Sequence, residues 1–175
     1  MKDLPIKKIQ DLSKEELIGL VRDAAKNWIA HDGLWFRAVE DEFGFEAAFK
    51  LDGDAWKKFT IIEAKRIMKR FRIEQGGGIS ALTQALKFKL YSHINEHEFV
   101  KLTDKQCIFR LKSCRVHAAR RRAGLRDLPC KPIGIVEYGE FARAIDPRIK
   151  TICLVCPPDP HPPDVWCEWQ FILEG

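Results

Sequence analysis

The sequence lacks long apolar runs and has no low-complexity linker or internal repeat. No stretch approaches the roughly 18 consecutive apolar residues that a membrane span requires, which argues against a membrane protein. The first eight residues, Met1 to Lys8, also lack the apolar core of an export signal. We therefore expect a cytoplasmic protein that does not associate with membranes.

The charge balance of the chain is mildly basic. The 175 residues carry a formal net charge of +5, and 46% of them are hydrophobic. This length and composition suffice for a buried core. So mild a basic excess permits nucleic-acid binding but does not require it. In a reducing cytoplasm, six cysteines favour metal binding, catalysis or simple burial over disulfides.

The N-terminal half shows helical periodicity. Ser13-Lys-Glu-Glu16 has the spacing of a capping box, and apolar residues then recur every three or four positions through Trp28. We expect this helix to be interrupted at His31-Asp32-Gly33 and a second helix to cover residues 34–43. The tryptophans at positions 28, 35 and 56 are expected in the core.

Two further interruptions are predicted before the chain changes character. Asp52-Gly53-Asp54 should separate a short helix, 45–51, from a long helix that begins near Trp56. Gly76-Gly77-Gly78 should end that long helix, and the period from Ile79 to about Ile94 again indicates a helix.

The period changes to two after about residue 97. Alternating apolar residues predict a hairpin over 99–111, then helices over 114–123 and 135–144, then strands over 150–156 and 165–173. This order implies an antiparallel sheet with two helices on one face, an α+β fold. We divide the chain into a helical region, 1–97, and a cysteine-rich module, 98–175, packed together as one compact unit.

Cys114 begins a predicted helix, and His117 lies one turn further on the same face. Unpaired amides at a helix start favour a thiolate, so Cys114 could be a nucleophile, with His117 or His161 moving protons. Arg115 or the helix start could then hold a small anionic substrate. The alternative is that Cys114 is a buried free thiol.

A Cys-x-x-Cys pair can grip one tetrahedral metal, and Cys153 and Cys156 have that spacing. Cys167 follows eleven residues later, and Cys130 or Cys114 would complete four soft ligands for zinc, for iron or for an iron–sulfur cluster. Buried free thiols without a cofactor are the competing interpretation. Cys107 alternates with core residues and is predicted to be purely structural.

Other polar clusters carry weaker signals. The basic runs 65–72 and 120–122 have no aromatic interleaving, so solvated helix faces are favoured over nucleic-acid binding. Strand edges in a small module make a homodimer a reasonable expectation.

Several segments resemble known families. They are Asp32-Gly-Leu-Trp-Phe-Arg-Ala-Val-Glu-Asp-Glu-Phe-Gly44, Glu46-Ala-Ala, Asp54-Ala-Trp56, Cys130-Lys-Pro, Ile145-Asp-Pro-Arg148, Cys156-Pro-Pro-Asp159 and Cys167-Glu-Trp-Gln-Phe171. Over nearly the whole chain they resemble a family of uncharacterised cytosolic proteins from bacteria and archaea. In layout the C-terminal half is similar to the 4-vinyl reductase domain, a small-molecule-binding module. A looser likeness is to the aminothiazoline carboxylate hydrolases.

Two hypotheses follow from these patterns and likenesses. In the first, the protein binds a small molecule or a metal ion through the cysteine cluster, with Trp169 and His161 beside the ligand, in a sensing, carrier or accessory role. In the second, it is a cysteine-dependent hydrolase in which Cys114 attacks the substrate.

Overall fold

The computed structural model describes residues 8–175; the segment 1–7, which holds most of the stretch examined for an export signal, lies outside the described residues. After a short 3-10 turn, η1 (Ile9–Asp11), two long helices meet at Gly44: α1 (Lys14–Phe43) and α2 (Phe45–Phe71). The predicted capping box is confirmed, because the Ser13 hydroxyl accepts from the backbone N–H of Glu16 at 3.2 Å and the Glu16 carboxylate accepts from Ser13 N–H at 2.8 Å. Gly44 takes a φ of +85°, which suits glycine at the junction.

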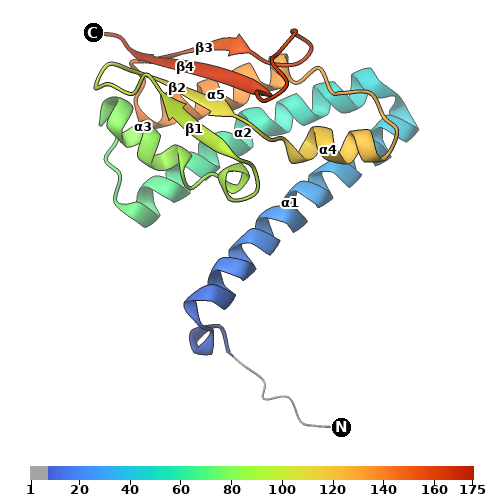
Figure 1. The fold of residues 1–175 in the computed structure, drawn as a ribbon, viewed down its shortest axis with the longest axis horizontal. Coiled ribbons are helices and arrows are strands. Elements are labelled where there is room, and N and C mark those ends of the chain that lie inside the picture. Colours follow the sequence, from blue (N-terminus) through green and yellow to red (C-terminus); the bar gives the residue numbers. More distant parts are fainter. Residues whose placement is uncertain (1–7) are drawn as a thin grey trace.

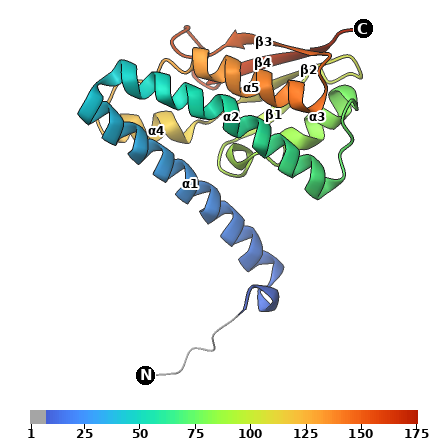
Figure 2. The same ribbon diagram turned by 180° about the vertical axis from the view of Figure 1, so that it is seen from behind.

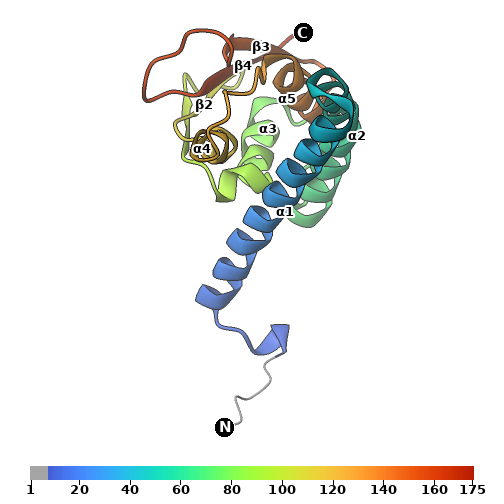
Figure 3. The same cartoon turned by 90° about the vertical axis from the view of Figure 1, so that its right-hand side faces the viewer.

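The predicted interruptions at 31–33 and 52–54 are wrong, because α1 and α2 run through both segments. A glycine inside a helix costs only about 1 kcal/mol, which tertiary packing readily outweighs. Trp56 is buried as predicted, at 5% exposure, whereas Trp35 is 65% exposed and the prediction for it is wrong. The N-terminal part of α1 extends away from the body of the molecule (Figures 1 and 3).

A break between helices is confirmed near the predicted glycines, but α2 already ends at Phe71, Gly78 is the first residue of the next helix, and that helix is shorter than predicted. α3 (Gly78–Leu86) is almost entirely buried and is followed by a 3-10 turn, η2 (Leu90–His93). Between them Lys89 is 1% exposed, with its Nζ 2.9 Å from Glu63 Oε2 and 3.1 Å from Glu137 Oε1. This buried ion cluster joins η2 to helices from both halves of the chain.

The C-terminal half forms a four-stranded antiparallel sheet with strand order β1-β2-β4-β3. Its strands are β1 (His97–Val100), β2 (Gln106–Leu111), β3 (Ile149–Val155) and β4 (Cys167–Leu173). Two helices, α4 (Arg115–Arg122) and α5 (Lys131–Ile145), connect β2 to β3. The α+β prediction is confirmed, including the hairpin and both C-terminal strands.

Helix α5 lies between the sheet and α2 (Figure 2), and α3 contacts β2 and β4 directly. The main hydrophobic core contains Phe109, Trp169 and Phe171 from the sheet and Phe141 from α5, all at 2% exposure or less. Thr60 of α2 donates its hydroxyl hydrogen to the carbonyl oxygen of Glu137 at 2.9 Å. Within residues 8–175 no helix is long and apolar enough to cross a membrane.

Candidate functional site

A cavity of about 450 Å³ lies among α1, α2, α4 and α5, next to the first residues of β4. Aromatic side chains from several elements line it: Phe36, Trp56, Tyr91, Tyr138, Trp166 and Trp169. Four of the six cysteines also line it: Cys114, Cys130, Cys156 and Cys167. This volume suits a small molecule and lies within the range of ligand pockets.

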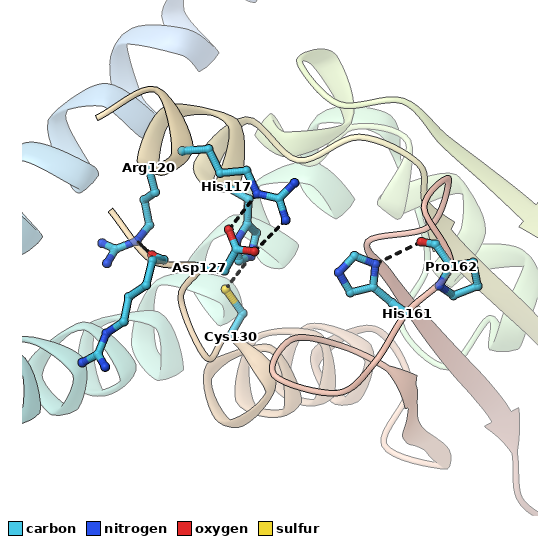
Figure 4. A network of polar contacts seen from close by, with 8 residues as sticks. His117, Arg120, Asp127, Cys130, His161 and Pro162 are labelled. Carbon is cyan, nitrogen blue, oxygen red and sulfur yellow. Dashed lines mark hydrogen bonds and ion pairs between the residues drawn. The ribbon is translucent and has the colours of Figure 1, made fainter. Parts of the chain in front are cut away.

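Cys130, His117 and Asp127 form a chain of polar contacts at this cavity. The Cys130 sulfur lies 3.4 Å from His117 Nε2, and the other ring nitrogen, Nδ1, lies 3.2 Å from Asp127 Oδ1 (Figure 4). The histidine–carboxylate contact is close but not aligned as a hydrogen bond. A nucleophile within reach of a base that is itself next to a carboxylate is the arrangement of a thiol enzyme.

Local structure explains the placement of these three groups. Cys130 is the residue before α5, and Pro132 in the first turn is typical of a helix start. His117 is held in α4 at 2% exposure, and Trp166 stacks on its ring with centroids 4.5 Å apart. Asp127 lies on the loop between the two helices, where Arg121 binds its carboxylate at 2.7 and 3.1 Å.

The electrostatics of the site keep the thiol and the imidazole neutral at rest. Burial raises the pKa of Cys130 well above the ordinary value, and neighbouring acidic groups act in the same direction. Burial lowers the pKa of His117, although Asp127 opposes this. The Arg121 guanidinium, with His117, lowers the pKa of Asp127. The triad therefore rests as thiol, imidazole and carboxylate, with the positive end of the α5 dipole at Cys130.

Cys114, the nucleophile predicted from the sequence, directly precedes α4 and lines the same cavity. Burial raises its pKa to about 11, while the backbone amides of His117 and Val116 act in the opposite direction but less strongly. The histidine proposed as its base instead has Cys130 at its Nε2.

The five predicted metal ligands come only partly together. Cys156 and Cys167 line the cavity with Cys114 and Cys130, whereas Cys153 does not. Within residues 8–175, no group of three or more histidine, cysteine, aspartate or glutamate side chains is arranged so that it could hold a metal ion. Zinc or iron therefore stays a prediction that the geometry does not support.

The predicted ligand-binding residues lie in three different settings. Trp169 is 1% exposed, lines the cavity and stacks on Tyr138 with centroids 4.8 Å apart. Arg115 is exposed at the edge of the cavity. His161 is outside the cavity lining, and its Nδ1 lies 3.0 Å from the carbonyl oxygen of Pro162 (Figure 4).

Sequence reasoning identified Cys130 and His117 separately but did not pair them, and it missed Asp127. The lysine and proline after Cys130 were a usable signal, since they mark a helix start like the one used to select Cys114. It also missed Asp32 and Asp52, two carboxyl groups on the cavity wall that were assigned to helix interruptions.

Comparison with known proteins gives a family without an activity. No curated protein and no solved structure matches the chain. The expected likenesses to the 4-vinyl reductase domain and to the aminothiazoline carboxylate hydrolases thus remain predictions. A family model described as a family of unknown function, DUF6125, matches residues 9–173. The match covers almost the whole chain, and the protein belongs to this family.

Proposed function

We propose that the protein is a cysteine-dependent hydrolase of small molecules, in which Cys130 is the nucleophile, His117 the base and Asp127 the group that orients His117. The observation that supports this most directly is the 3.4 Å contact between the Cys130 sulfur and His117 Nε2 at the cavity. In this proposal Cys130 takes the place of Cys114 as the nucleophile, and His117 remains the base.

The chemical step requires only water as co-reactant. The Cys130 sulfur forms a bond to an electrophilic carbon of the substrate while its proton passes to His117 Nε2. The bond to the leaving group breaks with its electron pair, and the imidazolium supplies a proton to that group. Water then attacks the thioester-like intermediate and regenerates the thiol. Because His117 is neutral at rest, the imidazolium that forms during the reaction needs a counter-charge, and the Asp127 carboxylate supplies it.

p-Nitrophenyl acetate provides a test without knowledge of the natural substrate. We expect a burst of about one equivalent of p-nitrophenolate, and an acetyl group on Cys130 by peptide mass spectrometry. The variants Cys130→Ala and His117→Gln should abolish the burst, and Asp127→Asn should slow acetylation. His93→Gln is the matched control, since His93 lies on η2 and does not line the cavity.

Two results would overturn the proposal. One is acetylation that persists at equal rate in His117→Gln with its fold intact by circular dichroism. The other is acetylation confined to cysteines other than Cys130.

A second function, binding of a small molecule without chemistry, is favoured by one specific observation. Burial raises the pKa of the Cys114 and Cys130 thiols and so keeps them protonated. A pocket that only binds a ligand does not need a thiolate. On this alternative the chain would act as a sensor, carrier or accessory protein. A ligand that raises the melting temperature equally in wild type and in Cys130→Ala, with no burst in the wild type, would support it over the hydrolase.

A further inference from the structure

We infer that the substrate of this site carries a positively charged nitrogen group, which Asp32 and Asp52 bind inside the cavity. This rests on the proposed function, because it assigns the substrate class of the site around Cys130. It differs from the anionic substrate expected from Arg115 on sequence grounds.

The acidic wall is built by three helices. Asp32 comes from the middle of α1, Asp52 from α2 and Glu137 from α5, and all three line the cavity. Glu137 already has a counter-charge, because Lys89 Nζ lies 3.1 Å from its Oε1. Neither Asp32 nor Asp52 has such an ion pair among the described residues. Two carboxyl groups therefore face the cavity without a cation.

Burial makes these two groups unusual. Both are half-buried, and this desolvation raises the pKa of Asp32 to about 6, against the effect of His31. It raises the pKa of Asp52 to about 7, where Asp32 and Glu137 act in the same direction and a hydrogen bond from Trp56 opposes them. A carboxylate removed from water is unfavourable unless it is paired. A bound ammonium or amidinium group would supply the missing counter-charge and favour the ionised form of both carboxyls.

The rest of the wall suits the same ligand. Trp56 and Tyr91 both line the cavity beside the aspartates, so aromatic surface is available to a cation there. Trp169 also lines the cavity, and its buried indole N–H has no hydrogen-bond partner among the described residues. A substrate with an acceptor atom beside the cationic group would satisfy this N–H.

The basic side chains around the cavity do not cancel the acidic wall. Lys26 pairs with Asp23, Arg37 pairs with Glu40 and Asp41, and Arg120 donates to a backbone carbonyl while it covers Phe36. Arg115 and Arg122 are exposed, so solvent screens their charges. The buried part of the cavity thus holds the two aspartates, the aromatic rings and a buried cation, Arg120, which is 8% exposed and packs on Phe36. Arg115 and Arg122 lie at its exposed edge.

Two thiol reagents of opposite charge test the inference directly. The trimethylammonium-ethyl and sulfonato-ethyl methanethiosulfonates both form a mixed disulfide with a thiol and release methanesulfinate. Their rates at Cys130 would be measured at pH 8 by peptide mass spectrometry and divided by their rates with 2-mercaptoethanol. We expect the cationic reagent to be favoured by about tenfold or more, as expected for close opposite charges.

Amide variants identify the groups responsible. Asp52→Asn and Asp32→Asn should each reduce the preference several-fold and together remove it. Asp54→Asn is the matched control on α2, because Asp54 is exposed, pairs with Lys50 and does not line the cavity.

The outcomes separate the two proposals. No reaction of Cys130 with either reagent would contradict the proposed function itself. Equal normalised rates for the two reagents at Cys130, or a faster normalised rate for the sulfonate, would refute the inference of a cationic substrate. Neither result would contradict the proposed hydrolase. If the preference for the cationic reagent persists in the double variant, other groups cause it, and the role of Asp32 and Asp52 is refuted.

Discussion

Gly134, at the start of α5, lies against the face of the cavity that Trp169 forms. A Cβ atom added there would lie 2.5 and 2.7 Å from two ring carbons of Trp169. Trp169 is 1% exposed and its ring stacks on Tyr138, so a movement of the ring away from α5 would disturb that stacking or narrow the cavity. We therefore expect Gly134→Ala to force a shift of α5 or of the indole.

A matched substitution on the same helix separates this clash from the helix propensity of alanine. At Gly139 the nearest atom to an added Cβ is 3.7 Å away and belongs to the flexible Arg143 side chain. Gly139→Ala should stabilise by up to about 1 kcal/mol, the usual gain of alanine over glycine in a helix. In Gly134→Ala an overpacking cost of about 1–3 kcal/mol opposes that gain. Gly134→Ala should therefore be about 1–3 kcal/mol less stable than Gly139→Ala and no more stable than wild type.

Urea denaturation followed by tryptophan fluorescence measures this difference, and in thermal unfolding about 1 kcal/mol corresponds to roughly 2–4 °C for a chain of this size. The shifted indole should also change the rate of Cys130 acetylation in Gly134→Ala but not in Gly139→Ala. Equal stabilisation by both alanines would refute the close approach of α5 to Trp169.

Three further predictions concern buried polar groups. Lys89→Met leaves the carboxylates of Glu63 and Glu137 buried without a cation, so it should lower the free energy of unfolding by about 3–5 kcal/mol. Because burial raises the pKa of Glu137 above 4.5, denaturation curves should show this loss shrinking as the pH falls and the carboxyl becomes neutral. Asp146 has a pKa lowered to about 2 from 3.8, so its stabilisation is present above 3.8 and lost as pH falls through about 2. Asp146→Asn should therefore cost about 1–3 kcal/mol at pH 7 and flatten the acid limb of the stability curve, and a limb unchanged from wild type would contradict this. Cys107 is fully buried with a pKa raised to about 12, so iodoacetamide at pH 8 should label it only after unfolding, and its labelling in the native protein would be evidence against the core position.

Sequence periodicity predicted the sheet well because its signal is local. In β2 and β4 the inward residues alternate with outward ones, and one face meets α5, so the alternation reports burial directly. The predictions of breaks in α1 and α2 are wrong because they also rested on a local signal. Asp32-Gly33 and Asp52-Gly53 look like turn sequences, yet these aspartates stay within helices and line the cavity. An Asp-Gly pair within a helix that lines a cavity thus has the same local sequence as a turn.

The sequence identifies Cys130 and His117 as candidate site residues, but it does not predict that the two side chains contact each other. Helical spacing relates His117 to Cys114, three residues away, and says nothing about Cys130, thirteen residues away. Their contact depends on the path of the loop after α4, which the Arg120 guanidinium fixes by donating to the carbonyl oxygen of Arg126 at 2.8 Å. Interactions of this kind are set by tertiary structure and leave no period in the sequence.

The polar chain from His117 to Cys130 is contained in fourteen consecutive residues, whereas the two aspartates of the acidic wall, Asp32 and Asp52, belong to α1 and α2. On the proposed function, reactivity and selectivity would be encoded in separate stretches of the sequence. Substitutions in the two long helices can change which compounds are accepted while the reacting groups stay in place. Family members that share the short segment but differ around positions 32, 52 and 56 would then divide into groups with different substrates, and variation at those three positions is the place to look for such divergence.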